Sequence, residues 1–245
     1  MHTAMVKIPL FAIGTVFGSF LNVCIYRVPR GKSIVFPGSH CTSCGHPIPF
    51  YDNIPIVSYL LLKGRCRFCK SKISVKYPIV ELLTGGVFLA TFVRFGWSVE
   101  LISACVLFSL LIIVAFIDFD TETVPDKITI PGIAIGLVLS TLTISILKGL
   151  LGAAIGFISL YSMASIGRLA FKREVMGGGD IKLLTMIGAF VGPVSVLLVL
   201  FVGSFFGVIG GVVSRRGKLP FAPFLSIATF LVTLYGDKLL CAFGY

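Results

Sequence analysis

Charged residues and histidine are scarce in this sequence. Only 13% of the 245 residues are charged, and only 10 are Asp or Glu. The three histidines, His2, His40 and His46, all lie in the first fifth of the chain. Their placement argues against a Ser-His-Asp triad or an HExxH zinc protease in the later part. No Gly-Lys-Ser/Thr follows the three glycines at 177–179, which argues against a phosphate-binding loop.

Hydrophobic residues, at 56% of the chain, form several runs of bilayer length. These runs predict an all-α polytopic membrane protein with about eight transmembrane helices, whose surroundings are the lipid bilayer. The net charge of +11 does not indicate a nucleic-acid partner, because the basic residues cluster in loops between apolar runs. With the N-terminus outside, 17 of the 21 Lys and Arg residues face the cytoplasm, which is the usual bias of membrane proteins.

The apolar runs also predict the domain organisation. We expect a first transmembrane helix within 1–27, a small cytoplasmic domain at 28–77, and a seven-helix membrane domain at 78–245. The later helices are expected at 78–95, 101–117, 128–147, 150–166, 181–213 and 221–240, where the run 181–213 contains two helices.

The run 181–213 is expected to cross the membrane twice and to turn at Gly192-Pro193. A single crossing would place the basic loop 215–218 outside, against the charge bias. The first arm then has only about 12 residues, or ~18 Å of helix, which is shorter than a hydrocarbon core of ~30 Å. We therefore expect residues 177–180 to dip below the membrane surface and to line a cavity there.

Four of the seven cysteines form two CxxC pairs, Cys41 with Cys44 and Cys66 with Cys69. Two such pairs, separated by 21 residues, suit a tetrahedral Zn²⁺ site of four thiolates. A reducing cytoplasm argues against disulfides, and the absence of a βαβ pattern argues against a redox dithiol. The pairs predict a structural zinc ion that stabilises a small segment with few large apolar side chains.

Two aspartates stand at the ends of apolar runs that both reach the cytoplasmic side. Asp118 ends the third expected helix, and Asp180 begins the sixth, directly after the three glycines. Carboxylates at a membrane are costly and therefore indicate function. A pair of them can share one proton and hydrolyse an amide without His or metal. Helix polarity favours the anion on Asp180 and the proton on Asp118.

The acids near Asp118 have simpler interpretations. Asp120 and Glu122 are typical of solvated loop charges, and Asp126 stands where the next helix needs an N-cap. Residue spacing alone leaves an aspartyl dyad and an ion- or proton-coupled transporter equally open. Glu81 is expected to make a structural ion pair with a loop lysine such as Lys182.

At this point the motifs resemble those of type IV prepilin leader peptidases, which are intramembrane aspartyl proteases. Residues 177–184 resemble the GxGD-x-K-L motif of that family, and Asp118 with 124–126 resembles its first aspartate motif. The resemblance extends along almost the whole chain, through the CxxC pairs and through Gly18-Ser-Phe-Leu-Asn22, Arg27-Val-Pro29, Asp52-Asn-Ile-Pro55, Gly64-Arg-Cys66, Tyr77-Pro78-x-x-Glu81 and Leu219-Pro-Phe-Ala-Pro223. The short chain also resembles Gram-positive competence-type members.

The resemblance implies the reaction and its location. It implies cleavage of a basic leader from prepilins or pseudopilins, after a glycine, at the cytoplasmic face of the bacterial cytoplasmic membrane. It makes Asp118 and Asp180 catalytic, with Gly177, Gly179 and Lys182 as their supporting residues.

Members with the cysteine-bearing domain also methylate the new N-terminal residue, commonly Phe, with S-adenosylmethionine. Gly18, Asn22 and Arg27 are candidates for supporting that second activity. Buried hydrogen bonding by Asn22 and a topology anchor at Arg27 are the alternative roles. A third class, a zinc-ribbon scaffold for pilus assembly, would need the cysteines but neither aspartate.

Overall fold

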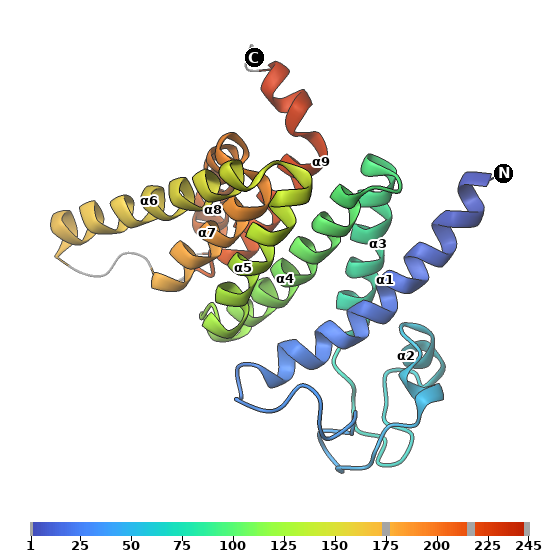
Figure 1. Cartoon of the computed structure of the whole chain (residues 1–245). Helices are drawn as coiled ribbons and strands as arrows, with labels where there is room; N and C mark the ends of the chain where they lie inside the picture. The colour runs from blue at the N-terminus through green and yellow to red at the C-terminus, as the bar shows by residue number, and fades with distance from the viewer. Residues whose placement is uncertain (1, 173–176, 215–218, 243–245) are drawn as a thin grey trace. The chain divides into compact units, whose positions relative to one another are not determined.

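The computed structural model describes residues 2–172, 177–214 and 219–242. Within these ranges the chain is helical, apart from short connections between helices and the loops around the cysteines, which contain two isolated β-bridges. The helices are α1 (His2–Arg27), the 3-10 helix η1 (Phe50–Asn53), α2 (Val57–Leu61), α3 (Lys76–Phe95), α4 (Val99–Thr121), α5 (Asp126–Thr143), α6 (Ile146–Phe171), α7 (Gly178–Val191), α8 (Pro193–Ser214) and α9 (Ala222–Ala242) (Figure 1). The predicted all-α polytopic architecture is confirmed.

Six of the helices in the described ranges are long and apolar enough to cross a membrane: α1, α3, α4, α5, α6 and α8. The chain is therefore a multi-pass membrane protein. α7 has 14 residues, and α9 offers a shorter apolar stretch, Ala222–Gly236. Their crossing of the membrane stays a prediction.

The chain folds as two compact units, one ending at Val93 and the other beginning at Arg94. In the first unit, α1 and α3 approach each other closely where both carry glycine. A Cβ added at Gly14 would lie 2.8 Å from Cα of Gly85, and one added at Gly18 would lie 2.7 Å from Cα of Glu81. Such contacts require glycine, because a real Cβ would force the helices apart.

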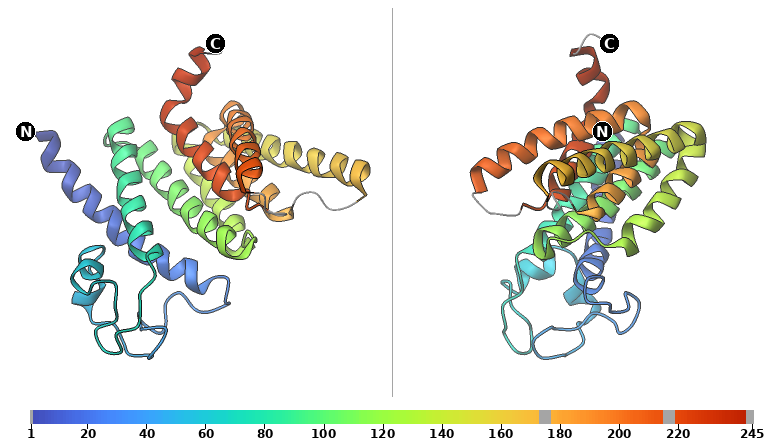
Figure 2. Two further views of the ribbon diagram at one scale, coloured as in Figure 1. Left: turned by 180° about the vertical axis from the view of Figure 1, so that it is seen from behind. Right: turned by 90° about the vertical axis from the view of Figure 1, so that its left-hand side faces the viewer.

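In the second unit, α7 is the central helix and contacts α4, α5, α6, α8 and α9 (Figures 1 and 2). Its side chains Leu183, Leu184, Met186 and Ile187 are fully buried. Gly188 of α7 faces Gly152 of α6 with no room for a Cβ on either residue. This burial explains how a helix of only 14 residues is held at the centre of the unit.

The predicted break in the run 181–213 is confirmed. α7 ends at Val191, Gly192 takes φ of 82°, and α8 begins at Pro193. Glycine suits this positive-φ conformation because it has no Cβ, and proline suits the first turn of the next helix. α7 begins earlier than expected, at Gly178, so residues 178–180 form its first turn and are not an irregular loop. Their depth in a membrane stays a prediction.

Candidate functional site

Asp118 lies on the last turn of α4 and is 4% exposed. Its Oδ2 accepts a hydrogen bond of 3.1 Å from the backbone N–H of Ala222, the first residue of α9. The nearby acids Asp120, Glu122 and Asp126 are all exposed. Asp118 is thus the acid of this stretch that the fold holds inside the protein.

Asp180 lies in the first turn of α7 and is partly exposed. Its backbone N–H donates to the carbonyl oxygen of Gly177 at 3.2 Å. The carboxyl groups of Asp180 and Asp118 are close enough for their charges to interact, and α4 contacts α7 directly. Two acids that are 62 positions apart in sequence thus lie on two contacting helices and influence each other electrostatically.

The start of α7 is fixed against the turn that joins α4 to α5. Gly179 packs on Val124, where an added Cβ would lie 2.7 Å from the Cβ of the valine. Lys182 Nζ lies 2.7 Å from both carboxylate oxygens of Asp126. The expected pairing of Lys182 with Glu81 is wrong, because Lys182 forms its ion pair with Asp126 of the same unit.

Asp126 also differs from its expected role as an N-cap. Pro125 holds the N-cap position, and Asp126 is the first residue of α5, with no side-chain capping bond. Its carboxylate instead turns to the ammonium group of Lys182. The loop acid thus joins two helices of the second unit.

The four CxxC cysteines converge on one point in the first unit. Their sulfur atoms all lie within 4.8 Å of one another, and Cys41 Sγ lies 3.8 Å from Cys69 Sγ. Zn–S bonds of ~2.3 Å in a tetrahedron place the sulfurs about 3.8 Å apart, whereas a disulfide needs ~2.05 Å. All four are free thiols. The donor set therefore fits the expected zinc ion.

Each CxxC pair forms a backbone knuckle of the same design. Cys41 N–H donates to His46 O, and Cys66 N–H donates to Ser71 O, both at 2.9 Å. The residue after each pair has left-handed backbone: Gly45 with φ of 71° and Lys70 with φ of 58°. Backbone N–H groups of the first knuckle, those of Cys44 and then Ser43, lower the pKa of the Cys41 thiol to about 6. That shift favours the thiolate that a metal needs.

The three residues linked to methylation all have structural contacts in the first unit. Gly18 lets α1 approach α3 at Glu81. Asn22 Nδ2 donates to Tyr77 O at 3.0 Å. Arg27 is buried, and its guanidinium donates to three carbonyl oxygens of the following loop, those of Ser33, Pro37 and Gly38.

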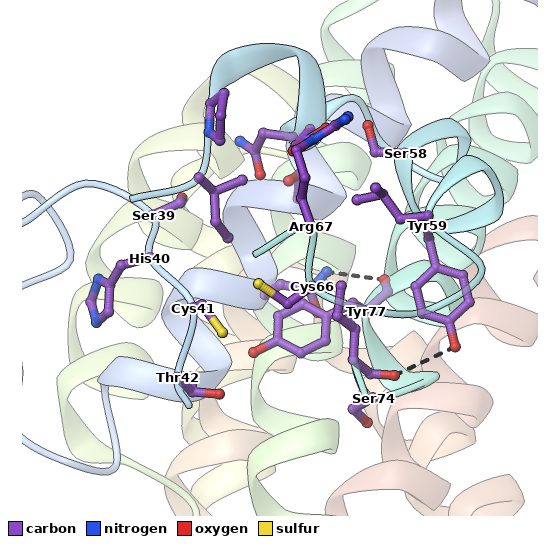
Figure 3. A pocket seen from close by; sticks show the side chains of 18 of the residues that line it. Ser39, His40, Cys41, Thr42, Ser58, Tyr59, Cys66, Arg67, Ser74 and Tyr77 are labelled. Carbon is purple, nitrogen blue, oxygen red and sulfur yellow. Dashed lines mark hydrogen bonds and ion pairs between the residues drawn. The ribbon is translucent and has the colours of Figure 1, made fainter. Parts of the chain in front are cut away.

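A cavity of about 360 Å³ lies between α1, α3 and the cysteine loops, and Figure 3 shows it from close by. Its volume is within the ~300–1,000 Å³ of small-molecule sites. Asn22 and Arg27 line it, together with Tyr59 and Tyr77. Figure 3 shows Cys41 and Cys66 beside Tyr77, so the metal cluster forms part of the same wall.

Two features of the sites gave no usable signal in the sequence. The Ala222 N–H group that binds Asp118 belongs to the backbone, so no residue type marks it. Glu81 lines the cavity and accepts a 2.7 Å hydrogen bond from the N–H of Ile56, which has φ of 61°. Its place in the motif after Tyr77-Pro78 was the only sign of a special role.

Both units of the chain match domains of known peptidases. Residues 12–95 match the bacterial peptidase A24 N-terminal domain, and residues 105–212 match the type IV leader peptidase family. No solved structure matches the chain significantly.

Curated relatives named prepilin leader peptidase/N-methyltransferase include proteins of three bacteria. The protein of Myxococcus xanthus is 47% identical over 83% of this chain, which spans 61% of that relative's length. The protein of Neisseria gonorrhoeae is 35% identical over 94% of this chain and 91% of its own length. The protein of Bacillus subtilis is 39% identical over 94% of this chain and 95% of its own. These matches give no support to a transporter.

Proposed function

The chain belongs to the type IV leader peptidase family, and from this membership we propose that it cleaves the leader peptide from type IV prepilins or pseudopilins and methylates the new N-terminus. The relatives carry both activities in their names, and this chain matches both the N-terminal and the peptidase regions. The observation that supports the peptidase assignment is that Asp118 and Asp180 lie on contacting helices and influence each other electrostatically.

The aspartyl mechanism needs one ionised and one protonated carboxyl group. The anion removes a proton from water, which attacks the scissile carbonyl, and the acid protonates the departing amine. Two carboxyl groups that share a site hold one proton between them more readily than both ionise. The site thus contains the groups that amide hydrolysis requires without a metal.

We propose a position for the shared proton that differs from the one that the helix ends suggested. The N–H of Ala222 points at Asp118 Oδ2, and a backbone donor favours the anion. We therefore assign the charge to Asp118 and the retained proton to Asp180, within a dyad that titrates as a pair.

The zinc ion is proposed to be structural. It would be held by Cys41, Cys44, Cys66 and Cys69, and it would fix the loops that form the cavity wall. S-adenosylmethionine would supply the methyl group, as the name of the relatives implies. Both the zinc segment and the aspartyl site are proposed to face the cytoplasm, as the loop charges indicate.

Mass spectrometry of a co-expressed prepilin tests both activities in one measurement. The wild-type chain should yield a mature pilin shortened by its leader and heavier by one methyl group. Asp118→Asn and Asp180→Asn should each leave the leader attached, whereas Asp120→Asn, a matched change two residues from Asp118, should cleave normally. A normal cleavage rate in either catalytic variant would refute the dyad. Loss of pilus assembly without loss of cleavage in Cys→Ser variants would instead favour a scaffold.

A further inference from the structure

Glu81 is a buried carboxylate whose charge is not matched by a cation within the described residues. Its side chain lies on α3, is 8% exposed and lines the cavity of the first unit. It accepts hydrogen bonds from the N–H of Ile56 and the hydroxyl of Ser19. In the part of the chain that the structure describes, no Lys or Arg makes an ion pair with it. Buried carboxylates without a cation are costly and require a reason.

The two arginines of the cavity wall bind other groups, and its lysine is exposed. Arg67 makes two hydrogen bonds to Asp52, of 2.7 and 2.6 Å. Arg27 donates to three carbonyl oxygens, and Lys72 is exposed. A carboxylate can accept about four hydrogen bonds, so Glu81 keeps acceptor capacity toward the cavity.

The local structure holds Glu81 in place at some cost. Ile56 is a β-branched residue at φ of 61°, a conformation that such residues rarely adopt. Its N–H is held by the Glu81 carboxylate at 2.7 Å. On the other side, Gly18 brings α1 against the backbone of Glu81. Strained backbone of this kind concentrates at ligand sites.

We propose that Glu81 binds the free α-amino group of the cleaved pilin in this cavity and accepts its proton during methylation. This inference rests on the proposed methyltransferase activity. A protonated amine supplies the missing cation, and the aromatic and apolar walls suit an apolar first residue.

The reaction balances with one base and one sulfonium methyl donor. An N-terminal ammonium group cannot attack carbon until it loses a proton. Glu81 takes that proton, the freed nitrogen pair forms a bond to the methyl carbon, and the methyl–sulfur bond breaks. The product is a secondary ammonium ion and a neutral thioether, and Glu81 returns its proton to water.

Peptide binding tests the proposal without any methyl donor. The probes are a mature pilin N-terminal peptide with a free amine and the same peptide acetylated at its N-terminus, each titrated against the full-length zinc-loaded protein in detergent. The wild-type protein should bind the free amine at least about tenfold more tightly. Equal affinity for the two peptides would overturn the proposal without use of any variant.

Glu81→Gln is the decisive variant, because Gln Oε1 still accepts the Ile56 N–H while the charge is lost. It should bind the two peptides equally, methylate the free-amine peptide about 100-fold more slowly, and cleave prepilin normally. Glu100→Gln, on an exposed helix end of the other unit, should behave as wild type. Preserved amine preference in Glu81→Gln, or loss of its zinc and cleavage, would show that Glu81 has only a structural role.

The same peptides separate this proposal from the function on which it rests. A chain that cleaves prepilin but never methylates the free-amine peptide would remove the methyltransferase assignment and this role together, and would leave the peptidase intact. Asp180→Ala should abolish cleavage and still methylate the pre-cleaved peptide. Loss of S-adenosylmethionine binding in Glu81→Gln, with amine preference kept, would assign Glu81 to the methyl donor and refute the amine role.

Discussion

Gly179→Ala is predicted to disable cleavage, whereas Gly178→Ala is predicted to have almost no effect. Both residues lie in the first turn of α7, directly before Asp180. An added Cβ at Gly178 meets no atom within 4 Å, but one at Gly179 would lie 2.7 Å from the Cβ of Val124. The two substitutions are therefore chemically identical and differ in this single contact.

The size of the effect follows from that distance. Carbon atoms in contact lie at about 3.5–4.0 Å, so α7 and Val124 must separate by close to 1 Å. Val124 cannot easily yield, because the residue before Pro125 has restricted backbone. A misplacement of ~1 Å at a catalytic group can cost about 100-fold in rate. Ala is also the better helix former by ~1 kcal/mol, so neither variant should unfold α7.

The assay is the cleavage rate of a purified prepilin by each variant in detergent or liposomes. Gly178→Ala should remain within about twofold of wild type, as expected for an uncrowded surface change. Gly179→Ala should fall by about 100-fold, and adding Val124→Gly should restore part of the loss. Equal rates for the two alanine variants would refute the idea that this contact sets the position of Asp180.

Four further predictions concern the same two sites. Lys182→Met and Asp126→Asn should each slow cleavage about three- to fivefold, because an exposed ion pair contributes at most ~1 kcal/mol. The double variant should be no slower than either single variant, and additive losses in a double-mutant cycle would contradict the pairing. Ala222→Pro keeps the geometry of a first helical residue but removes the N–H that binds Asp118, so cleavage should fall about tenfold or more. Ala222→Val keeps the N–H and serves as the control. Equal cleavage rates for the two variants would contradict this role of the N–H. Lys70→Gly should tighten zinc binding in a chelator competition, because left-handed backbone costs a non-glycine residue ~1 kcal/mol; weaker binding would contradict it. Chelation of zinc should make the four-cysteine segment sensitive to limited proteolysis while the membrane helices stay protected, and an unchanged digestion pattern would argue against a structural metal.

The sequence predicted best those features that depend on local chemistry or on the membrane. Apolar runs and loop charges located the long helices, and the same charges required the break at Gly192-Pro193, which the structure contains. The CxxC spacing predicted a four-sulfur cluster, and the four thiols do converge. Each of these patterns is set by a constraint that acts within a few residues or across one bilayer.

The features that the sequence did not reveal are long-range contacts between ordinary groups. The partner of Lys182 is Asp126, 56 positions away, and nothing in composition favoured it over other acids. The donor to Asp118 is a backbone group 104 positions away. Positive φ angles at Lys70 and Ile56 also escape sequence reasoning, because neither residue type prefers them.

The spacing of the second aspartate motif follows from the way α7 meets the turn before α5. Gly179 and Lys182 are three residues apart, so they share one face of the helix. Gly179 packs on Val124 in the turn, and Lys182 binds Asp126, the first residue of α5. Asp180 is one position further round the helix, where its carboxyl group is influenced by the charge of Asp118. One residue inserted between Asp180 and Lys182 would rotate the lysine by about 100° and separate the ion pair from the glycine contact. The short distance between glycine, acid and lysine is therefore a geometric requirement for bringing the two acids together.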